Sequence, residues 1–180
     1  MKRLTLPSHE YLSQCFSFTK STGSLRWKNR PPEHFQSVTR CLQANTRYAG
    51  KEAGCLMVDG HIGVRLDGKL YYAHRIIWML VTGVDPGILE VDHKNMDKAD
   101  NRWRNLRLAT HEQQSYNVLR HSGNTSGVKG VSFNKRTSKW IALVQGRRRK
   151  IRKEFALFAE AVAAVRAARK QVHKRFTNHG

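Results

Sequence analysis

A short run of small polar residues divides the chain, and this division limits the size of anything that it can fold into. Residues 121–127 include Gly123 and Gly127 among His, Ser, Asn and Thr, a composition typical of linkers and turns. The chain has 180 residues, so each flanking segment can bury only a modest core. We therefore predict two small modules, over residues 1–120 and 128–176, joined by a linker at 121–127.

Positive charge is concentrated after this linker. The formal net charge is +20, and residues 118–180 hold 16 Lys and Arg against only Glu154 and Glu160. Such an excess of positive charge favours a polyanionic partner, and we predict duplex DNA. No apolar run approaches the roughly 18 residues of a membrane span, and no apolar segment or cleavage site follows the basic N-terminus. We therefore expect no membrane contact and a cytoplasmic location.

The cysteines argue against a structural metal. Cys15, Cys41 and Cys55 are odd in number and widely spaced, which fits neither a disulfide framework nor a paired zinc ligand motif. We expect buried thiols and no structural zinc.

The first module shows strand and helix patterns around glycine turns. Residues 23–28 and 58–70 predict short strands, the second range as a hairpin with Asp67 and Gly68 at its tip. Residues 72–82 are apolar at helical spacing, and Gly83 ends the predicted helix. For residues 35–48 a loop over DNA and a disordered insertion both stay open.

The second module predicts three strands followed by one helix. Strands over residues 128–133, 139–145 and 149–155 are separated by short polar turns, and residues 158–172 carry an Ala-rich apolar stripe. The helix can cover one face of an antiparallel sheet, which leaves the other face for a partner. The fold class is therefore α+β.

One polar cluster has the chemistry of phosphodiester hydrolysis. Asp92 can supply a hard oxygen ligand for Mg²⁺, and His93 an imidazole base that activates water near neutral pH. Asn105 can orient the imidazole through its side-chain amide. Neighbouring residues of a regular strand face opposite sides, so we also predict a bend or strand end just before Lys94. An Asp-His pair alone is most often a surface turn.

A wider string adds weight to this cluster. Residues 73–78 (AHRIIW), 91–95 (VDHKN) and 100–110 (DNRWRNLRLAT) closely resemble the HNH endonucleases of phage genomes and mobile introns, with a core motif at about 72–117. The resemblance implies a ββα-metal fold that uses Mg²⁺ or Mn²⁺. It implies that His93 is the general base, that Asp92 binds the metal and that Asn105 supports the base.

The resemblance also implies a second metal ligand beyond Thr110, where this sequence departs from the family. Gln114 fits the position best, and His111 and Asn117 stay open as alternatives. The polar residues between His93 and Asn105, including Asn101, are assigned to turn structure. Arg75 has two interpretations, a phosphate contact and a structural role.

The second module resembles the plant ethylene-response-factor type of DNA-binding domain in residues 126–133, in residues 139–142 and in the order of its elements. That family lays its sheet in the major groove. Most contacts here would be to phosphates, and Trp140 is also a candidate core aromatic. The candidate DNA-binding residues of this module are Arg136, Lys139, Trp140, Arg147, Arg148, Arg149, Lys150 and Arg152.

These features together predict a metal-dependent DNA endonuclease of the HNH homing type. One site cuts one strand, so nicking is preferred, by a monomer or weak dimer encoded by a phage and acting in a bacterial host. Two alternatives are a sequence-specific DNA-binding regulator with a decayed nuclease site and a basic RNA-binding protein, against which the motif spacing argues.

Overall fold

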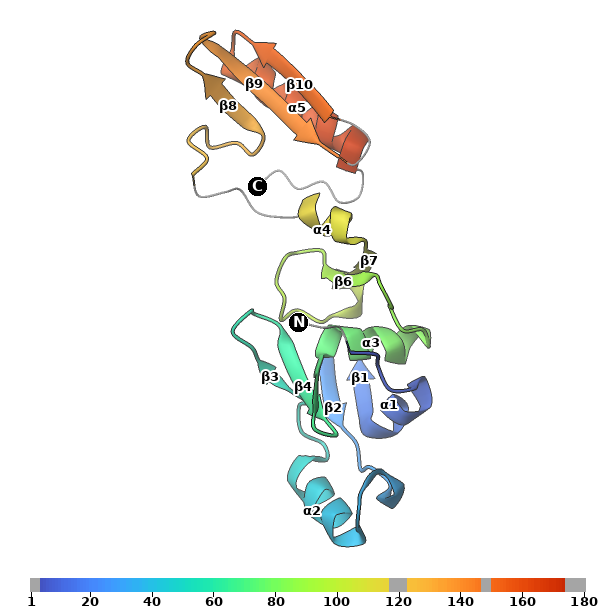
Figure 1. Ribbon diagram of the computed structural model, residues 1–180. Coiled ribbons are helices and arrows are strands. Elements are labelled where there is room, and N and C mark those ends of the chain that lie inside the picture. Colours follow the sequence, from blue (N-terminus) through green and yellow to red (C-terminus); the bar gives the residue numbers. More distant parts are fainter. Residues whose placement is uncertain (1–3, 117–122, 147–149, 174–180) are drawn as a thin grey trace. The chain divides into compact units, whose positions relative to one another are not determined.

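The computed structural model describes residues 4–116, 123–146 and 150–173. It contains two compact units, Met1–Ala109 and Thr110–Gly180. This boundary comes earlier than the linker predicted at 121–127, and it assigns the short helix α4 (His111–Tyr116) to the second unit. Both units combine small antiparallel sheets with helices, so the α+β class predicted from the sequence is confirmed (Figure 1).

The first unit contains three small sheets packed around helices. Its β-strands pair as β1 with β2, as β3 with β4 and β5, and as β6 with β7. Its elements are α1 (His9–Cys15), β1 (Phe16–Thr19), β2 (Ser24–Trp27), η1 (Pro32–His34), α2 (Val38–Tyr48), β3 (Cys55–Leu56), β4 (Ile62–Leu66), β5 (Lys69–Tyr72), α3 (Ala73–Thr82), β6 (Glu90–His93), η2 (Trp103–Asn105) and β7 (Leu106–Ala109).

The hairpin and helix predicted before the site are both present. Strands β4 and β5 pair antiparallel, and the turn between them has Asp67 and Gly68 at φ 49° and 74°. Helix α3 follows at once and ends at Gly83, whose left-handed φ of 73° lets its N–H bond to the Met79 carbonyl. These turns form because glycine adopts positive φ without a steric penalty.

Residues 35–48, which the sequence left undecided, contain helix α2. The Ser37 side chain accepts a hydrogen bond from the Arg40 N–H at 3.2 Å and caps the first turn. Among the helix residues only Cys41 is buried, whereas Val38 and Leu42 are more than 60% exposed. This segment therefore lacks the broad apolar stripe that would have marked it as a core helix.

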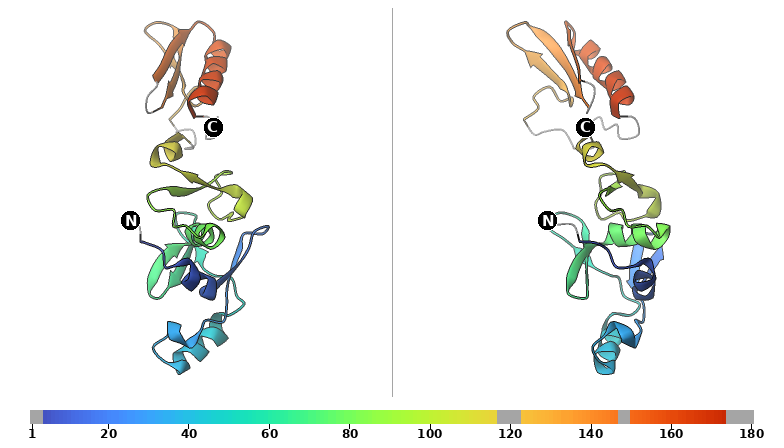
Figure 2. Two further views of the ribbon diagram at one scale, coloured as in Figure 1. Left: turned by 90° about the vertical axis from the view of Figure 1, so that its right-hand side faces the viewer. Right: turned by 45° about the vertical axis from the view of Figure 1, so that its right-hand side comes forward.

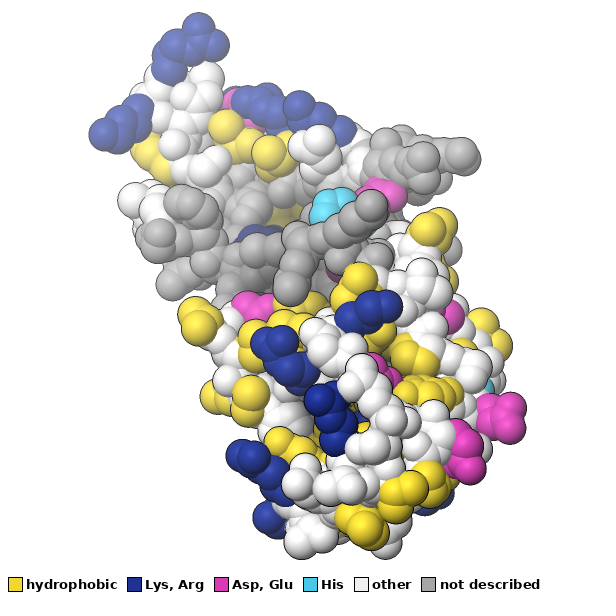
Figure 3. Space-filling model, turned by 60° about the horizontal axis from the view of Figure 1, so that its bottom comes forward, with side chains coloured by type: hydrophobic (Ala, Val, Ile, Leu, Met, Phe, Trp, Pro, Cys, Tyr) yellow, Lys and Arg dark blue, Asp and Glu magenta, His cyan; other side chains and the backbone are white. Residues whose placement is uncertain are grey.

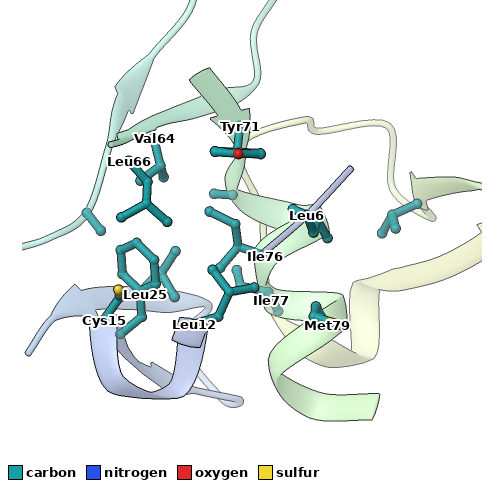
Figure 4. Close-up of a cluster of buried hydrophobic side chains, with 14 of the residues drawn as sticks. Leu6, Leu12, Cys15, Leu25, Val64, Leu66, Tyr71, Ile76, Ile77 and Met79 are labelled. Carbon is teal, nitrogen blue, oxygen red and sulfur yellow. The ribbon is translucent and has the colours of Figure 1, made fainter. Parts of the chain in front are cut away.

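Helix α3 is central to the core of the first unit (Figure 4). Its Ile76 and Ile77 are completely buried, and they pack in one cluster with Leu12 of α1 and with Val64 and Leu66 of β4. Burial of each such side chain contributes about 1.5–3 kcal/mol. The core thus fixes the position of α3. The first turn of this helix contains His74, whose ring centroid lies 5.1 Å from that of His93.

The second unit has the predicted sheet and helix. Strands β8 (Val131–Asn134), β9 (Lys139–Gln145) and β10 (Lys150–Phe155) form an antiparallel sheet in the order β10-β9-β8. Helix α5 (Phe158–His173) covers one face of this sheet, as the views of Figure 2 show. Strand β8 begins later than predicted, because Gly127 and Gly130 take positive φ and turn the chain ahead of Val131.

No helix within the described ranges has the length and apolar character needed to cross a bilayer.

Candidate active site

The polar cluster lies on the β6–β7 hairpin of the first unit. The register pairs Asp92 with Arg107 and His93 with Leu106. Strand β6 ends at His93, so the predicted strand end before Lys94 is confirmed. Met96 then turns the chain with a φ of 66°. The hairpin therefore presents Asp92 and His93 side by side at the point where the strand stops.

Asp92 is held by a cation that the sequence did not single out. The carboxylate is 5% exposed, and its Oδ2 accepts from Arg107 Nε and lies 2.7 Å from both Nε and Nη2. Residues facing each other across a strand pair are natural partners, so the register alone could have suggested Arg107. A buried carboxylate oxygen is a suitable donor for a hard divalent ion, and Asp92 therefore fits a role as metal ligand.

Asn101 holds the His93 imidazole in one orientation. The imidazole is 3% exposed, and its Nε2 lies 3.1 Å from Asn101 Oδ1. With Asn101 Oδ1 accepting, Nε2 carries the proton and the lone pair is on Nδ1. Burial lowers the pKa of His93 below its usual value, and His61 adds to this effect, whereas the bond to Asn101 opposes it. The ring is therefore neutral near pH 7, as a general base must be.

The predicted direct contact between Asn105 and the imidazole is wrong. The Asn105 amide donates to Asn95 Oδ1 at 2.9 Å and to the Asp100 carbonyl at 2.8 Å, and its Oδ1 accepts from the Asn95 N–H at 3.0 Å. Asn105 therefore closes the loop between the two strands. It acts on His93 only indirectly, because that loop carries Asn101.

The loop residues assigned to turn structure are mostly confirmed in that role. Asp97 Oδ1 accepts from the Ala99 N–H, and Asp100 accepts from Arg102 and Asn95. The bonds from Arg102 hold the pKa of Asp100 well below its usual value. Asn101 is the exception, because its Oδ1 contacts the His93 ring. Its short polar side chain gave no signal that distinguished it from its neighbours.

The rings of two further histidines lie close to the His93 ring. His61 precedes β4 and His74 lies in the first turn of α3, with ring centroids 5.9 Å and 5.1 Å from that of His93. His61 was not predicted, and His74 was treated only as an element of the motif. Burial holds the pKa of His74 well below its usual value, and the neighbouring rings of His93 and His61 act in the same direction.

The candidates for the second metal ligand lie beyond this unit. Gln114 is on α4, where its N–H bonds to the Thr110 carbonyl, and His111 begins the same helix. Asn117 lies outside the described residues. The assignment of Gln114 stays a prediction.

Arg75 has a structural partner. Its Nη2 lies 3.0 Å from Asp85 Oδ1, and its side chain is 12% exposed. The other Asp85 oxygen accepts from the Leu6 N–H at 3.1 Å. Arg75 thus joins α3 to the loop that follows it and to the N-terminal segment, which favours the structural interpretation over a phosphate contact.

The sheet of the second unit separates the predicted DNA-binding residues by face. Trp140 packs on Phe158 of α5 with ring centroids 4.7 Å apart, so it is a core aromatic and not a groove contact. Lys139 alternates with Trp140 along β9 and faces away from the helix, and the register places Arg152 opposite Leu143 on that same open face. Lys150 shares the face through its pairing with Gln145.

The remaining candidates of this unit lie in turns. Arg136 is exposed in the β8–β9 turn, where its N–H bonds to Asn134 Oδ1. Arg147, Arg148 and Arg149 lie outside the described residues. Lys and Arg side chains are present on both units in the face that Figure 3 draws.

A strand that ends in an Asp-His pair, a loop closed by asparagine and a second strand together form a polar site around a buried histidine. A family model described as HNH endonuclease matches residues 71–116. Protein 3.8 of Escherichia phage T7 is 30% identical over 105 residues, which cover 57% of this chain and 85% of that protein. The chain therefore belongs to the HNH endonuclease family.

Two further proteins are similar to parts of this chain. An uncharacterized HNH endonuclease of Acanthamoeba polyphaga mimivirus is 40% identical over 67 residues, covering 37% of this chain and 35% of that protein. The solved structure of the HNH homing endonuclease I-HmuI is 21% identical and has a TM-score of 0.36, covering 88% of this chain and 85% of that one.

Proposed function

We propose that this chain is a divalent-metal-dependent endonuclease that hydrolyses phosphodiester bonds of duplex DNA and cuts one strand at each encounter. The observation that carries the proposal is the state of His93. Its Nε2 is fixed by Asn101 at 3.1 Å, its Nδ1 carries the lone pair, and its pKa lies below the usual value. This imidazole can take a proton from water at Nδ1 near neutral pH.

The rest of the hairpin supports that step. Asp92 would hold the divalent ion, with Gln114 as the predicted second protein ligand, and Arg107 positions the Asp92 carboxylate through its bond to Oδ2. A bound divalent ion supplies charge stabilisation for the phosphate and for the leaving 3′ oxygen. Asn105 keeps the loop closed, and Asn101 keeps the base in one tautomer.

The second unit would hold the DNA. Its open sheet face carries Lys139, Lys150 and Arg152, and Glu154 on the same face accepts from Arg152 at 2.8 Å. Each cation that contacts a phosphate releases counterions from the duplex. The resemblance to ethylene-response-factor domains supports this sheet as the DNA-contacting surface. The apolar Ile141 and Leu143 lie between these cations on β9, where they can contact sugars or thymine methyl groups.

The relatives support a proposal about where the chain acts. Because a similar protein is encoded by an Escherichia phage, we propose that this chain acts on DNA in the cytoplasm of a bacterial host. A single site of this kind needs no partner subunit to nick, so a monomer suffices.

The test is conversion of supercoiled plasmid by wild type and His93→Ala, each with Mg²⁺, with Mn²⁺ and with EDTA. We expect nicked product only from wild type with metal, and nearly equal DNA affinity for the two proteins. Cleavage by His93→Ala at the wild-type rate would refute the assigned base. DNA binding without cleavage by wild type under every condition would favour a DNA-binding regulator.

A further inference from the structure

Three histidine rings from separate parts of the first unit lie close together at the end of strand β6. His61 lies in the turn before β4, His74 at the start of α3, and His93 at the end of β6. One ring nitrogen from each lies within 4.8 Å of the other two. The centroids of His61 and His74 are 5.0 Å apart, and the His74 and His93 rings meet edge to face.

The cluster has a polar atom without a hydrogen-bond partner. His74 is 5% exposed, and its Nδ1 is buried with no partner among the described residues. An unpaired buried polar atom of this kind is unfavourable, so such groups often mark a place where a ligand binds. An imidazole lone pair next to two other imidazoles is the donor set of borderline transition ions rather than of Mg²⁺.

His93 has the hydrogen-bonded support that metal-bound histidines commonly have, and His61 has a carboxylate close to its ring. Asp59 Oδ2 lies 3.2 Å from His61 Nδ1, although not in line for a hydrogen bond, and Asp59 Oδ1 accepts from the His61 N–H at 3.1 Å. Asn101 Oδ1 accepts from His93 Nε2. A partner oxygen on one ring nitrogen directs the lone pair of the other toward a metal. His93 Nδ1 is thereby left as a donor atom. A proton on His61 Nδ1, which the Asp59 carboxylate 3.2 Å away favours, would leave His61 Nε2 as the second donor.

We propose that His61, His74 and His93 form a binding site for a borderline divalent transition ion such as Zn²⁺, separate from the ion that Asp92 would hold. In a tetrahedral zinc site with Zn–N bonds of about 2.0–2.1 Å, the nitrogens are roughly 3.4 Å apart. In this structure the three ring nitrogens lie within 4.8 Å of one another, which is wider than that spacing. The rings would therefore move inward by side-chain rotation when the ion binds. The cysteines, which the sequence excluded from a zinc site, take no part.

The site has a consequence for cleavage, which rests on the proposed function. A transition ion at this site would occupy the His93 lone pair that the proposed base uses for water. Zn²⁺ should therefore inhibit Mg²⁺-supported cleavage, and extra Mg²⁺ should not reverse the inhibition, because Mg²⁺ prefers oxygen ligands.

Binding is tested first, without DNA, by calorimetric titration of the full chain with Zn²⁺. We expect one equivalent to bind wild type and Asp92→Asn alike. His61→Gln should bind at least about tenfold more weakly, because even the loss of a supporting residue around a metal costs 10–100-fold in affinity. His9→Gln, a change of an exposed histidine outside the cluster, is the matched control and should bind as wild type does.

X-ray absorption of zinc-loaded wild type provides a measurement that needs no variant. Three imidazoles around the ion support the site, and two or fewer overturn it. Loss of Zn²⁺ binding in Asp92→Asn but not in His61→Gln would also overturn it, because the ion would then sit at the predicted catalytic position. Cleavage with Mg²⁺ in the absence of zinc reports separately on the proposed nuclease.

Inhibition is then measured against each variant's own zinc-free rate. Zn²⁺ should slow wild type and His9→Gln but have at least about tenfold less potency on His61→Gln. Equal potency on all three proteins would refute the link between this site and the base.

Discussion

Removal of the Asn101 side chain should weaken the proposed base without removing its imidazole from the chain. In Asn101→Ala, His93 Nε2 loses the acceptor that lies 3.1 Å away in a site where both residues are buried. An unpaired buried donor costs roughly 1–3 kcal/mol. If the ring rotates or changes tautomer to avoid that cost, the productive state loses about tenfold to a hundredfold in population, since 1.36 kcal/mol is a factor of ten.

The assay is single-turnover cleavage of a labelled duplex over a range of pH. We expect Asn101→Ala to cleave about tenfold to a hundredfold more slowly than wild type, with little change in DNA affinity. Asn101→Asp keeps an acceptor for Nε2, and its added negative charge favours the imidazolium. This variant should therefore recover much of the rate at high pH, with the acidic limb of its pH profile moved to higher pH.

A double-mutant cycle separates positioning from a general loss of structure. If Asn101 acts through His93, the change Asn101→Ala should have almost no further effect in the His93→Ala background. Equal losses in both backgrounds would refute the reasoning. So would an Asn101→Asp profile whose acidic limb coincides with that of wild type.

Three further predictions concern stability and DNA binding. Because the pKa of His74 is well below its usual value in the folded chain, the unfolded chain binds more protons as the pH falls below about 6.5. The free energy of unfolding, measured with EDTA, should then drop by up to about 1.4 kcal/mol per pH unit. His74→Gln should show a shallower slope, and parallel slopes for the two proteins would contradict the assignment. Lys139→Ala and Arg152→Ala, on the open sheet face, should each reduce by about 0.9 the slope of log affinity for DNA against log salt concentration. Lys153 pairs with Ala142 on the helix side of the sheet, so Lys153→Ala should leave this slope unchanged. Gly130→Ala should lower the free energy of unfolding of the second unit by more than about 1 kcal/mol, because φ is +76° and the added Cβ would lie 2.6 Å from the Leu143 carbonyl oxygen. Thermal melts measure this change, and an unchanged melting temperature would refute the prediction.

Local signals in the sequence determined most elements of this protein. The Asp67-Gly68 turn and the Gly83 helix end depend on backbone conformations that glycine adopts easily, and the structure has both. The meander and helix of the second unit follow from alternating and helical apolar spacing, which neighbouring residues decide. The Asp92-His93 pair at a strand end was likewise readable, because strand geometry forbids both side chains from facing the same side of a regular strand.

Tertiary structure decided which side chains meet. Asn105 and Asn101 are both asparagines near the hairpin, and only the folded loop shows that Asn101 contacts His93 while Asn105 closes the loop. The sequence allowed Trp140 to face either side of its sheet, and its packing on Phe158 of α5 places it on the helix side. The meeting of His61, His74 and His93 depends on how β4, α3 and β6 pack on one core. Local preferences extend over a few residues, whereas these contacts join residues distant in the chain, and only burial of the shared core brings them together.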